Sequence, residues 1–136
     1  MPVEVEIQAD GGVVIVGSGV LTGVEIHASN ARIYATREQI LAQRYQITDL
    51  RAVERLDVEV EDVRRIAAQD RAAAAINPRI LSVVIGSQDI AYGLARMWAA
   101  YVEPAPFETA VFRTMEEART WLEERVGSAH AGDVNA

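Results

Sequence analysis

Apolar and polar residues alternate at the start of the chain, and helical spacing replaces this alternation further on. Residues 3–8, VEVEIQ, alternate with a period of two, which predicts a strand with one polar face. The turn sequence DGG follows at residues 10–12, and the continuously apolar VVIVGSG at 13–19 predicts a second, more buried strand. We expect these two strands to form a hairpin at the edge of a sheet.

The same reading predicts three further strands, with helices between them. The predicted strands are YQITDL at 45–50, RILSVVIG at 79–86 and FETAVFRT at 107–114. The predicted helices cover residues 23–35, 58–76, 88–102 and 115–126, with a short extra helical turn near 36–41. Strands that alternate with helices predict right-handed crossovers. The expected fold is therefore α/β, a single domain with a mostly parallel sheet of about five strands, an antiparallel N-terminal hairpin and about four helices.

Capping signals support several of these helix boundaries. Thr22 with Glu25, and the TREQ sequence at 36–39, have the spacing of capping boxes. Asp57 and Ser87 each precede a predicted helix, so either side chain is a candidate N-cap. Asn77, followed by proline, predicts the end of the 58–76 helix.

Length and composition limit the classes of protein to consider. The chain has 136 residues, enough for one domain, which we place at residues 1–126. Residues 127–136 show no periodicity and are predicted to form a disordered tail. No apolar run approaches the ~18 residues that span a membrane, and no signal peptide is evident, so a cytoplasmic location is expected.

Charge and residue usage exclude several kinds of chemistry. The chain has no cysteine, which removes disulfides and thiolate metal sites. Every basic side chain is arginine, so a Schiff-base lysine and a P-loop lysine are impossible. The net charge of −7 argues against a duplex nucleic-acid partner.

No catalytic, cofactor or metal motif emerges from the remaining residues. The segment GSGVLTG at 17–23 has the spacing Gly-x-Gly-x-x-x-Gly, which differs from a dinucleotide fingerprint and predicts a tight strand-to-helix turn. The two histidines do not form a pair with zinc-ligand spacing, and no Gly-x-Ser-x-Gly elbow is present. We therefore expect a protein that is not an enzyme and that has no cofactor and no metal site.

An aromatic stripe on the 88–102 helix suggests a ligand pocket. Met97, Trp98 and Tyr101 follow helical spacing, whereas Tyr92 lies off the stripe. Together with Trp121, these side chains have two interpretations, the lining of a pocket for an apolar ligand and ordinary core packing.

Two aspartates in the segment YQITDLRAVERLDVEV, residues 45–60, are the other candidate binding residues. Asp49 stands at the carboxyl end of a predicted strand, where α/β sheets usually bind ligands. Asp57 stands just before the following helix, so its interpretations are a binding residue and a helix cap.

The order of elements and this same segment resemble the STAS domain, the fold of anti-sigma-factor antagonists. The resemblance rests on the spacing of Asp49, Leu50, Val53, Leu56 and Asp57, and on VFRTMEEARTWL at 111–122, which looks like the last strand and helix of that family. It covers residues 3–126 and is greatest to bacterial STAS-like proteins that are themselves similar to CRAL-TRIO lipid-binding domains. It implies a regulatory module that binds proteins.

One position departs from the family pattern. In the antagonists the serine after the second aspartate is the phosphorylation site, and the resemblance places Val58 there. Valine cannot be phosphorylated, so the resemblance implies a STAS-like domain without this serine switch, unless a hydroxyl such as that of Thr48 replaces it.

Two hypotheses for function follow from these patterns. The first is a non-catalytic module that binds a protein partner or itself as a homodimer, since the N-terminal hairpin leaves an edge strand unpaired. The alternative is a binder of a small apolar or acyl ligand in a pocket beside the 88–102 helix.

Overall fold

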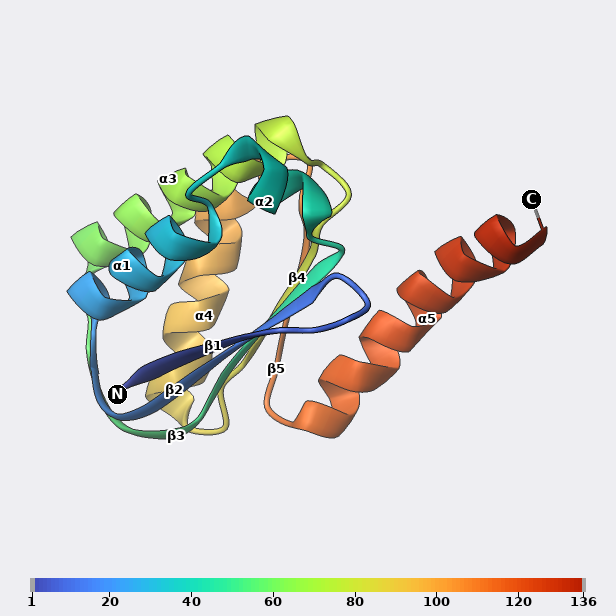
Figure 1. The fold of residues 1–136 in the computed structure, drawn as a ribbon. Helices are drawn as coiled ribbons and strands as arrows, with labels where there is room; N and C mark the ends of the chain where they lie inside the picture. The colour runs from blue at the N-terminus through green and yellow to red at the C-terminus, as the bar shows by residue number, and fades with distance from the viewer. Residues whose placement is uncertain (1, 136) are drawn as a thin grey trace.

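A five-stranded mixed sheet forms the centre of the computed structural model, which describes residues 2–135 (Figure 1). The strands are β1 (Val3–Ile7), β2 (Gly12–Thr22), β3 (Tyr45–Asp57), β4 (Leu81–Ile85) and β5 (Glu108–Phe112). They lie side by side in sequence order, β1 antiparallel to β2 and all other pairs parallel. The predicted α/β fold with its antiparallel N-terminal edge is confirmed.

Helices cover both faces of this sheet. They are α1 (Gly23–Ile33), α2 (Arg37–Ala42), α3 (Val60–Ile76), α4 (Asp89–Val102) and α5 (Met115–Asn135). Figure 1 shows α1 to α4 on one side of the sheet and α5 on the other. The short turn predicted near 36–41 is α2. The last helix continues beyond residue 126, and the division between a domain and a tail at that residue stays a prediction.

The two-sided cover explains why β4 is almost entirely apolar. Val84 packs into the core beneath α3 and α4, and Trp98 belongs to the same core. Val83 and Ile85 point to the opposite face and pack with Leu122 of α5. Since successive strand residues face opposite sides, a strand buried on both faces is a continuous apolar run.

The long strands β2 and β3 extend beyond the other strands at one end of the sheet. Their pairing continues to the partners Thr22 and Asp57, with register shifts between Val16 and Ser18 and between Gly19 and Val20. The prediction of a tight turn at 17–23 is therefore wrong, because most of that segment is strand. Its glycine at position 19 has a positive φ of 62°, so it serves a distortion within the strand, where glycine carries no steric cost.

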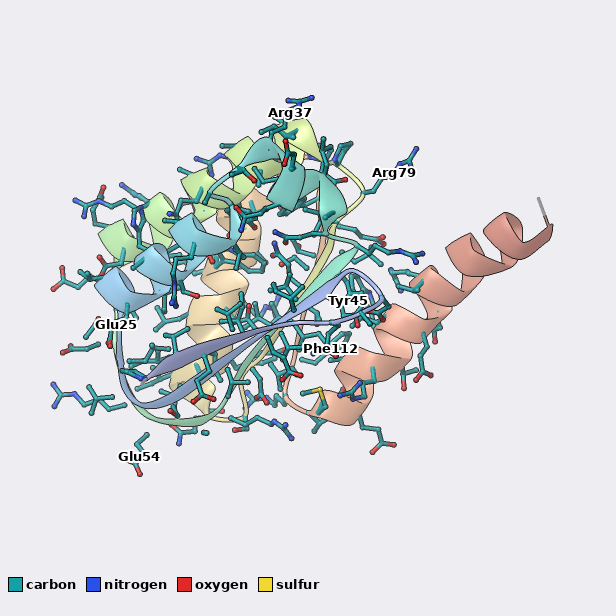
Figure 2. The ribbon with its side chains drawn as sticks, in the orientation of Figure 1. Glu25, Arg37, Tyr45, Glu54, Arg79 and Phe112 are labelled. Atoms are coloured by element: carbon teal, nitrogen blue, oxygen red, sulfur yellow. The ribbon has the colours of Figure 1, made fainter. Side chains whose placement is uncertain are left out.

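The β1–β2 hairpin closes through the predicted DGG turn. The Gly12 amide donates to Asp10 Oδ1 at 3.0 Å, and Gly11 has a positive φ of 89°. The Tyr45 hydroxyl donates to the same carboxylate, with Oη 2.8 Å from Asp10 Oδ2. Figure 2 shows Tyr45 next to this turn, so the first residue of β3 ties the hairpin to the parallel part of the sheet.

Both predicted capping boxes lie at helix starts. Thr22 caps α1, since its Oγ1 accepts from the Glu25 amide at 3.2 Å and the Glu25 carboxylate accepts from the Thr22 amide at 3.0 Å. Thr36 caps α2 and accepts from the Gln39 amide at 3.1 Å, but the Gln39 side chain donates to the Arg32 carbonyl at 3.2 Å, so only half of the predicted box at 36–39 forms. These local patterns are satisfied within four residues, which is why the sequence is enough to place them.

The predicted caps at Asp57 and Ser87 are wrong. The N-cap residues of α3 and α4 are Glu59 and Gln88. Asp57 instead closes the pairing of β3 with β2, and the Glu59 amide donates to Asp62 Oδ2 at 2.9 Å. The pairing of β2 with β3 extends to Asp57, a residue that the local sequence pattern assigned to the start of the helix.

Candidate functional site

A cavity of about 90 Å³ lies between the sheet and the helices that cover its α1–α4 face. Strands β2, β3 and β4 form its floor, and α1, α3 and α4 form its roof. Most of the wall is apolar and includes Ile15, Leu21, Val63, Ile66, Val84 and Leu94. Polar side chains converge on the same space, namely Ser29, Asn30, Gln46, Thr48, Asp70, Ser82 and Trp98. Apolar walls with a few convergent polar groups are typical of small-molecule sites.

Among the described residues that line this cavity, Asp70 of α3 is the only one with a charged side chain. Its Oδ1 accepts from Tyr34 Oη at 2.7 Å and from Asn30 Nδ2 at 3.3 Å, and its Oδ2 accepts from Trp98 Nε1 at 2.7 Å. The side chain is almost fully buried. Burial raises the pKa of Asp70 to about 6, although the hydrogen bonds from Tyr34 and Trp98 lower it in part.

The hydrogen bonds continue from Asp70 into the sheet. Gln46 Nε2 donates to Tyr34 Oη at 2.7 Å and to Gln43 Oε1 at 2.7 Å, while Gln46 Oε1 accepts from Ser82 Oγ at 3.1 Å. Burial, with the nearby Asp70 carboxylate, raises the pKa of Tyr34 well above its ordinary value. Tyr34 is therefore a neutral hydroxyl that both accepts and donates, and it links the buried amides of the sheet to the carboxylate of α3.

Ser29 differs from these connected groups. Its side chain is only 1% exposed and lines the cavity, yet its Oγ has no hydrogen-bond partner. Within the part of the chain whose side chains are described, Gln69 Oε1 is the other buried polar atom in this condition, and Gln69 does not line the cavity. A buried hydroxyl without a partner is uncommon, because the loss of its water is not compensated.

The residues proposed from the sequence do not gather around one point. Trp98 lines the cavity, whereas Met97 packs at the edge of the helical core. The ring of Tyr101 lies 5.5 Å from the guanidinium carbon of Arg64. Tyr92 lies outside the cavity, its ring 4.2 Å from the guanidinium carbon of Arg113. Of these aromatic positions, the structure therefore places only Trp98 in the cavity.

Asp49 lies away from the cavity. Residues 47 and 49 of β3 share the face that packs against α5, since strand side chains alternate, and the cavity is on the other face. Asp49 pairs with Arg51, with 2.9 Å between Oδ2 and Nη2, and also accepts from the Arg51 amide at 3.0 Å. Burial alone would raise the pKa of Asp49, but these bonds from Arg51 outweigh it and lower the pKa.

Asp57 lies at the end of β3, in a part of the surface where exposed apolar and acidic side chains occur together. Val20, Val24 and Val60, which we call the valine end, are 52%, 74% and 44% exposed. Val20 is near the end of β2, Val24 is in the first turn of α1, and Val60 opens α3. Because β2 and β3 pair to their last residues, these three positions share one end of the domain.

Acidic residues surround the valine end. They are Glu25, Glu54, Asp57, Glu59, Glu61 and Asp62. Figure 2 shows Glu25 and Glu54 at this end, whereas Arg37 and Arg79 project at another side of the molecule. Asp57 is mostly exposed, and its carboxylate lies 4.0 Å from Arg55 Nη2. Such an exposed pair contributes little to stability. Glu25 and Asp62 accept hydrogen bonds at the starts of α1 and α3, whereas Glu54, Asp57 and Glu59 are exposed to solvent.

Sequence reasoning missed the buried polar groups of the cavity. Asp70 falls on the same helical face as Val63, Ile66 and Ala73, which are buried in α3. An acid at a position where the helical period requires an apolar residue is a signal that the sequence does contain. Ser29 gives no such signal, because its lack of a partner depends on how α1 packs against the sheet.

The described residues were also compared with the requirements for a metal cluster and for a membrane-crossing helix. Among residues 2–126, whose side chains the structure describes, no group of three or more His, Asp or Glu is arranged to hold a metal ion. In the same range, no helix has both the length and the apolar character that crossing a bilayer requires.

Comparison with known proteins identifies a similar fold among solved structures and no match in sequence. No protein-family model matches the chain, and no curated protein matches it. Among solved structures, the chain is similar to the anti-sigma factor antagonist SpoIIAA in its unphosphorylated form, with a TM-score of 0.56, 17% identity, and 89% of this chain and 97% of that chain covered. It is also similar to the Bacillus cell fate determinant SpoIIAA in the phosphorylated form, with a TM-score of 0.52, 20% identity, and coverage of 88% and 98%.

The matches extend over almost the full length of both solved structures. At such identities the likeness concerns the backbone fold, and it agrees with the order of elements from β1 to α5 described above. The sequence pattern predicted a STAS-like fold from residues 45–60 and from the alternation of strands and helices, and the likeness to these two structures confirms that fold for the chain.

Proposed function

We propose that this protein is a non-catalytic module that binds a protein partner through the valine end. The observation that carries the proposal is the exposure of Val20, Val24 and Val60 at one end of the domain. Exposed apolar side chains that occur together and have a polar rim are typical of interaction surfaces. The STAS-like fold supports a protein-binding role, because the two similar structures are those of an anti-sigma factor antagonist.

The charges around the valine end indicate the chemistry of the partner. Glu25, Glu54 and Glu59 stand near the exposed valines. Arg55, which lies opposite Val20 in the sheet, is 4.0 Å from the carboxylate of Asp57, so acidic side chains outnumber basic ones at this end. A second copy of this surface would meet it with like charge, which disfavours self-association there. We therefore expect the partner to present an apolar patch among arginine or lysine side chains.

The proposal includes the absence of a serine switch at position 58. The resemblance to antagonists places their phosphorylated serine at Val58, which here lies between β3 and α3 and lines the cavity. Valine has no hydroxyl to receive a phosphate. Binding at the valine end would then be controlled by the amount of partner or by another site.

Introducing positive charge at the valine end tests this proposal. The variant Val24→Arg/Val60→Arg places two cations opposite a basic partner, and Leu41→Arg is the matched control, since Leu41 is a 51% exposed aliphatic residue on α2. Captures from a lysate of the source organism would be quantified by mass spectrometry, and the candidate partner would then be purified. The wild-type protein and Leu41→Arg should bind it alike, and the double variant at least about 10-fold more weakly. Equal binding by all three proteins would contradict the proposal.

Self-association through β1 is the second candidate. In the described chain β1 pairs only with β2, so one edge of its backbone lacks a strand partner, and Ile7 at its end is 68% exposed. Unpaired edges favour pairing with a second copy, although Glu4 and Glu6 on β1 oppose it. Light scattering at increasing concentration tests the dimer, and a monomer mass throughout would refute it.

A further inference from the structure

We propose that the cavity between α1, α3, α4 and the sheet binds a small neutral molecule with a hydrocarbon body and one hydroxyl group. This site is separate from the surface proposed above for a protein partner, and each proposal can fail without the other. Three features of the cavity carry the inference, namely its apolar wall, the unpartnered hydroxyl of Ser29, and the saturated carboxylate of Asp70.

The size and the wall of the cavity set the body of the ligand. The volume is about 90 Å³, and apolar side chains from β2, α3, β4 and α4 line most of it. An apolar cavity of ~150 Å³ stays dry and binds benzene. The smaller cavity here therefore suits a hydrocarbon of about four carbon atoms, which would replace contacts that the wall otherwise lacks.

Ser29 sets the polar group of the ligand. Its hydroxyl is buried, lines the cavity and has no hydrogen-bond partner. A hydroxyl can both donate and accept, so a single alcohol group on the ligand satisfies it in either direction. Bound in this way, the ligand would supply the partner that the protein itself does not provide.

Asp70 sets the charge of the ligand. An anion in the cavity would lie close to this buried carboxylate and would be repelled. Both carboxylate oxygens already accept hydrogen bonds, Oδ1 from Asn30 and Tyr34 and Oδ2 from Trp98. A cation would lose its water to a mostly apolar wall and would have to compete with these donors. A neutral ligand meets neither cost.

A matched series of four-carbon compounds tests the class of ligand on the full chain. The probes are butan-1-ol, butylammonium and butyrate, which share their hydrocarbon body and differ in charge. Binding would be followed by NMR through the indole N–H of Trp98, which lines the cavity. Butan-1-ol should give a saturable shift, and butyrate and butylammonium should each bind at least about 10-fold more weakly. No saturable shift with butan-1-ol, or tighter binding of either charged probe, would overturn the proposal.

Two variants test the position of the ligand. Ser29→Ala removes the unpartnered hydroxyl without adding volume. Because one hydrogen bond is lost, the affinity for butan-1-ol should fall by about 5- to 10-fold. Ala95→Leu fills the cavity from α4 and should abolish binding, with Val84→Ile as a milder filling variant if the first does not fold. Circular dichroism verifies each fold. Unchanged affinity in Ser29→Ala, or in a folded filling variant, would refute the site.

Discussion

The buried carboxylate of Asp70 should make the stability of this protein depend on pH in an unusual direction. Its folded-state pKa is raised from 3.8 to about 6. The folded protein therefore binds the proton more tightly than the unfolded chain does. Stability is greatest below the unfolded pKa, falls as pH rises from about 4 to about 6, and stays lowered above that range. Most paired carboxylates, including Asp49 with its lowered pKa, act in the opposite direction.

The magnitude follows from the difference between the two pKa values. A shift from 3.8 to about 6 corresponds to about 3 kcal/mol of unfolding free energy lost at neutral pH. Between pH 7 and pH 5, about 1 kcal/mol of this should return. Asp70→Asn cannot ionise and leaves one donor facing its amide group, which costs about 1–3 kcal/mol independently of pH. The difference in stability between wild type and this variant isolates the titration, because other groups are common to both.

Urea unfolding of both proteins between pH 4 and pH 8 measures this difference. On acidification from pH 7 to pH 5, the wild-type midpoint should rise relative to that of Asp70→Asn by roughly 0.5–1 M urea, given typical slopes for small domains. Parallel pH profiles for the two proteins over this interval would refute the reasoning. They would mean that Asp70 has an ordinary pKa or that the unfolded chain protects it equally.

Three smaller changes test other parts of the fold. Trp98→Phe removes the indole donor to Asp70, so urea unfolding should show a loss of about 2–4 kcal/mol; a loss below 0.5 kcal/mol would contradict the 2.7 Å bond. Gly12→Ala places a Cβ inside the ring of Tyr45 and should break its bond to the hairpin carboxylate. The raised pKa of Tyr45, about 12, should then return toward 10 in an absorbance titration, and an unchanged value would show that the ring has not moved. Gly19→Ala meets no atom within 4 Å but retains the positive φ, so calorimetry should record about 1 kcal/mol of strain; a neutral result would mean that the strand relaxes.

Local sequence patterns predicted the type and order of the elements, and long-range pairing decided their lengths. The strand predicted at 45–50 is β3, which runs to Asp57 because its second half pairs with the end of β2. That second half, RAVERLD, contains charged residues and has little strand character by itself. The ends of β2 and β3 form strands because they pair with each other, and neither end can be predicted as a strand before its partner is known. The cap expected at Asp57 and the turn expected at 17–23 were wrong for this same reason.

The candidate sites show a similar division. Trp98 was predicted because the spacing of apolar residues along the sequence places it on the apolar face of a helix. The structure shows that it lines the cavity. The side chains that meet it, Asp70 from α3 and Ser29 from α1, come from separate elements and converge only when these helices pack on the sheet. Convergence of this kind depends on the angles between elements, which the periodicity of a sequence does not contain.

The cavity also gives a physical reason for the valine at position 58. Val58 lies on the short connection from β3 to α3, is half-buried, and packs against the helical core while it lines the cavity. A serine there would bring a hydroxyl to a largely apolar wall, and a phosphate would have to leave that wall entirely because a dianion is not tolerated in it. Next along the chain stand Glu59 and Val60, which belong to the exposed acidic and apolar surface. In this chain the side chain at position 58 therefore continues the wall of the cavity and packs against the helical core.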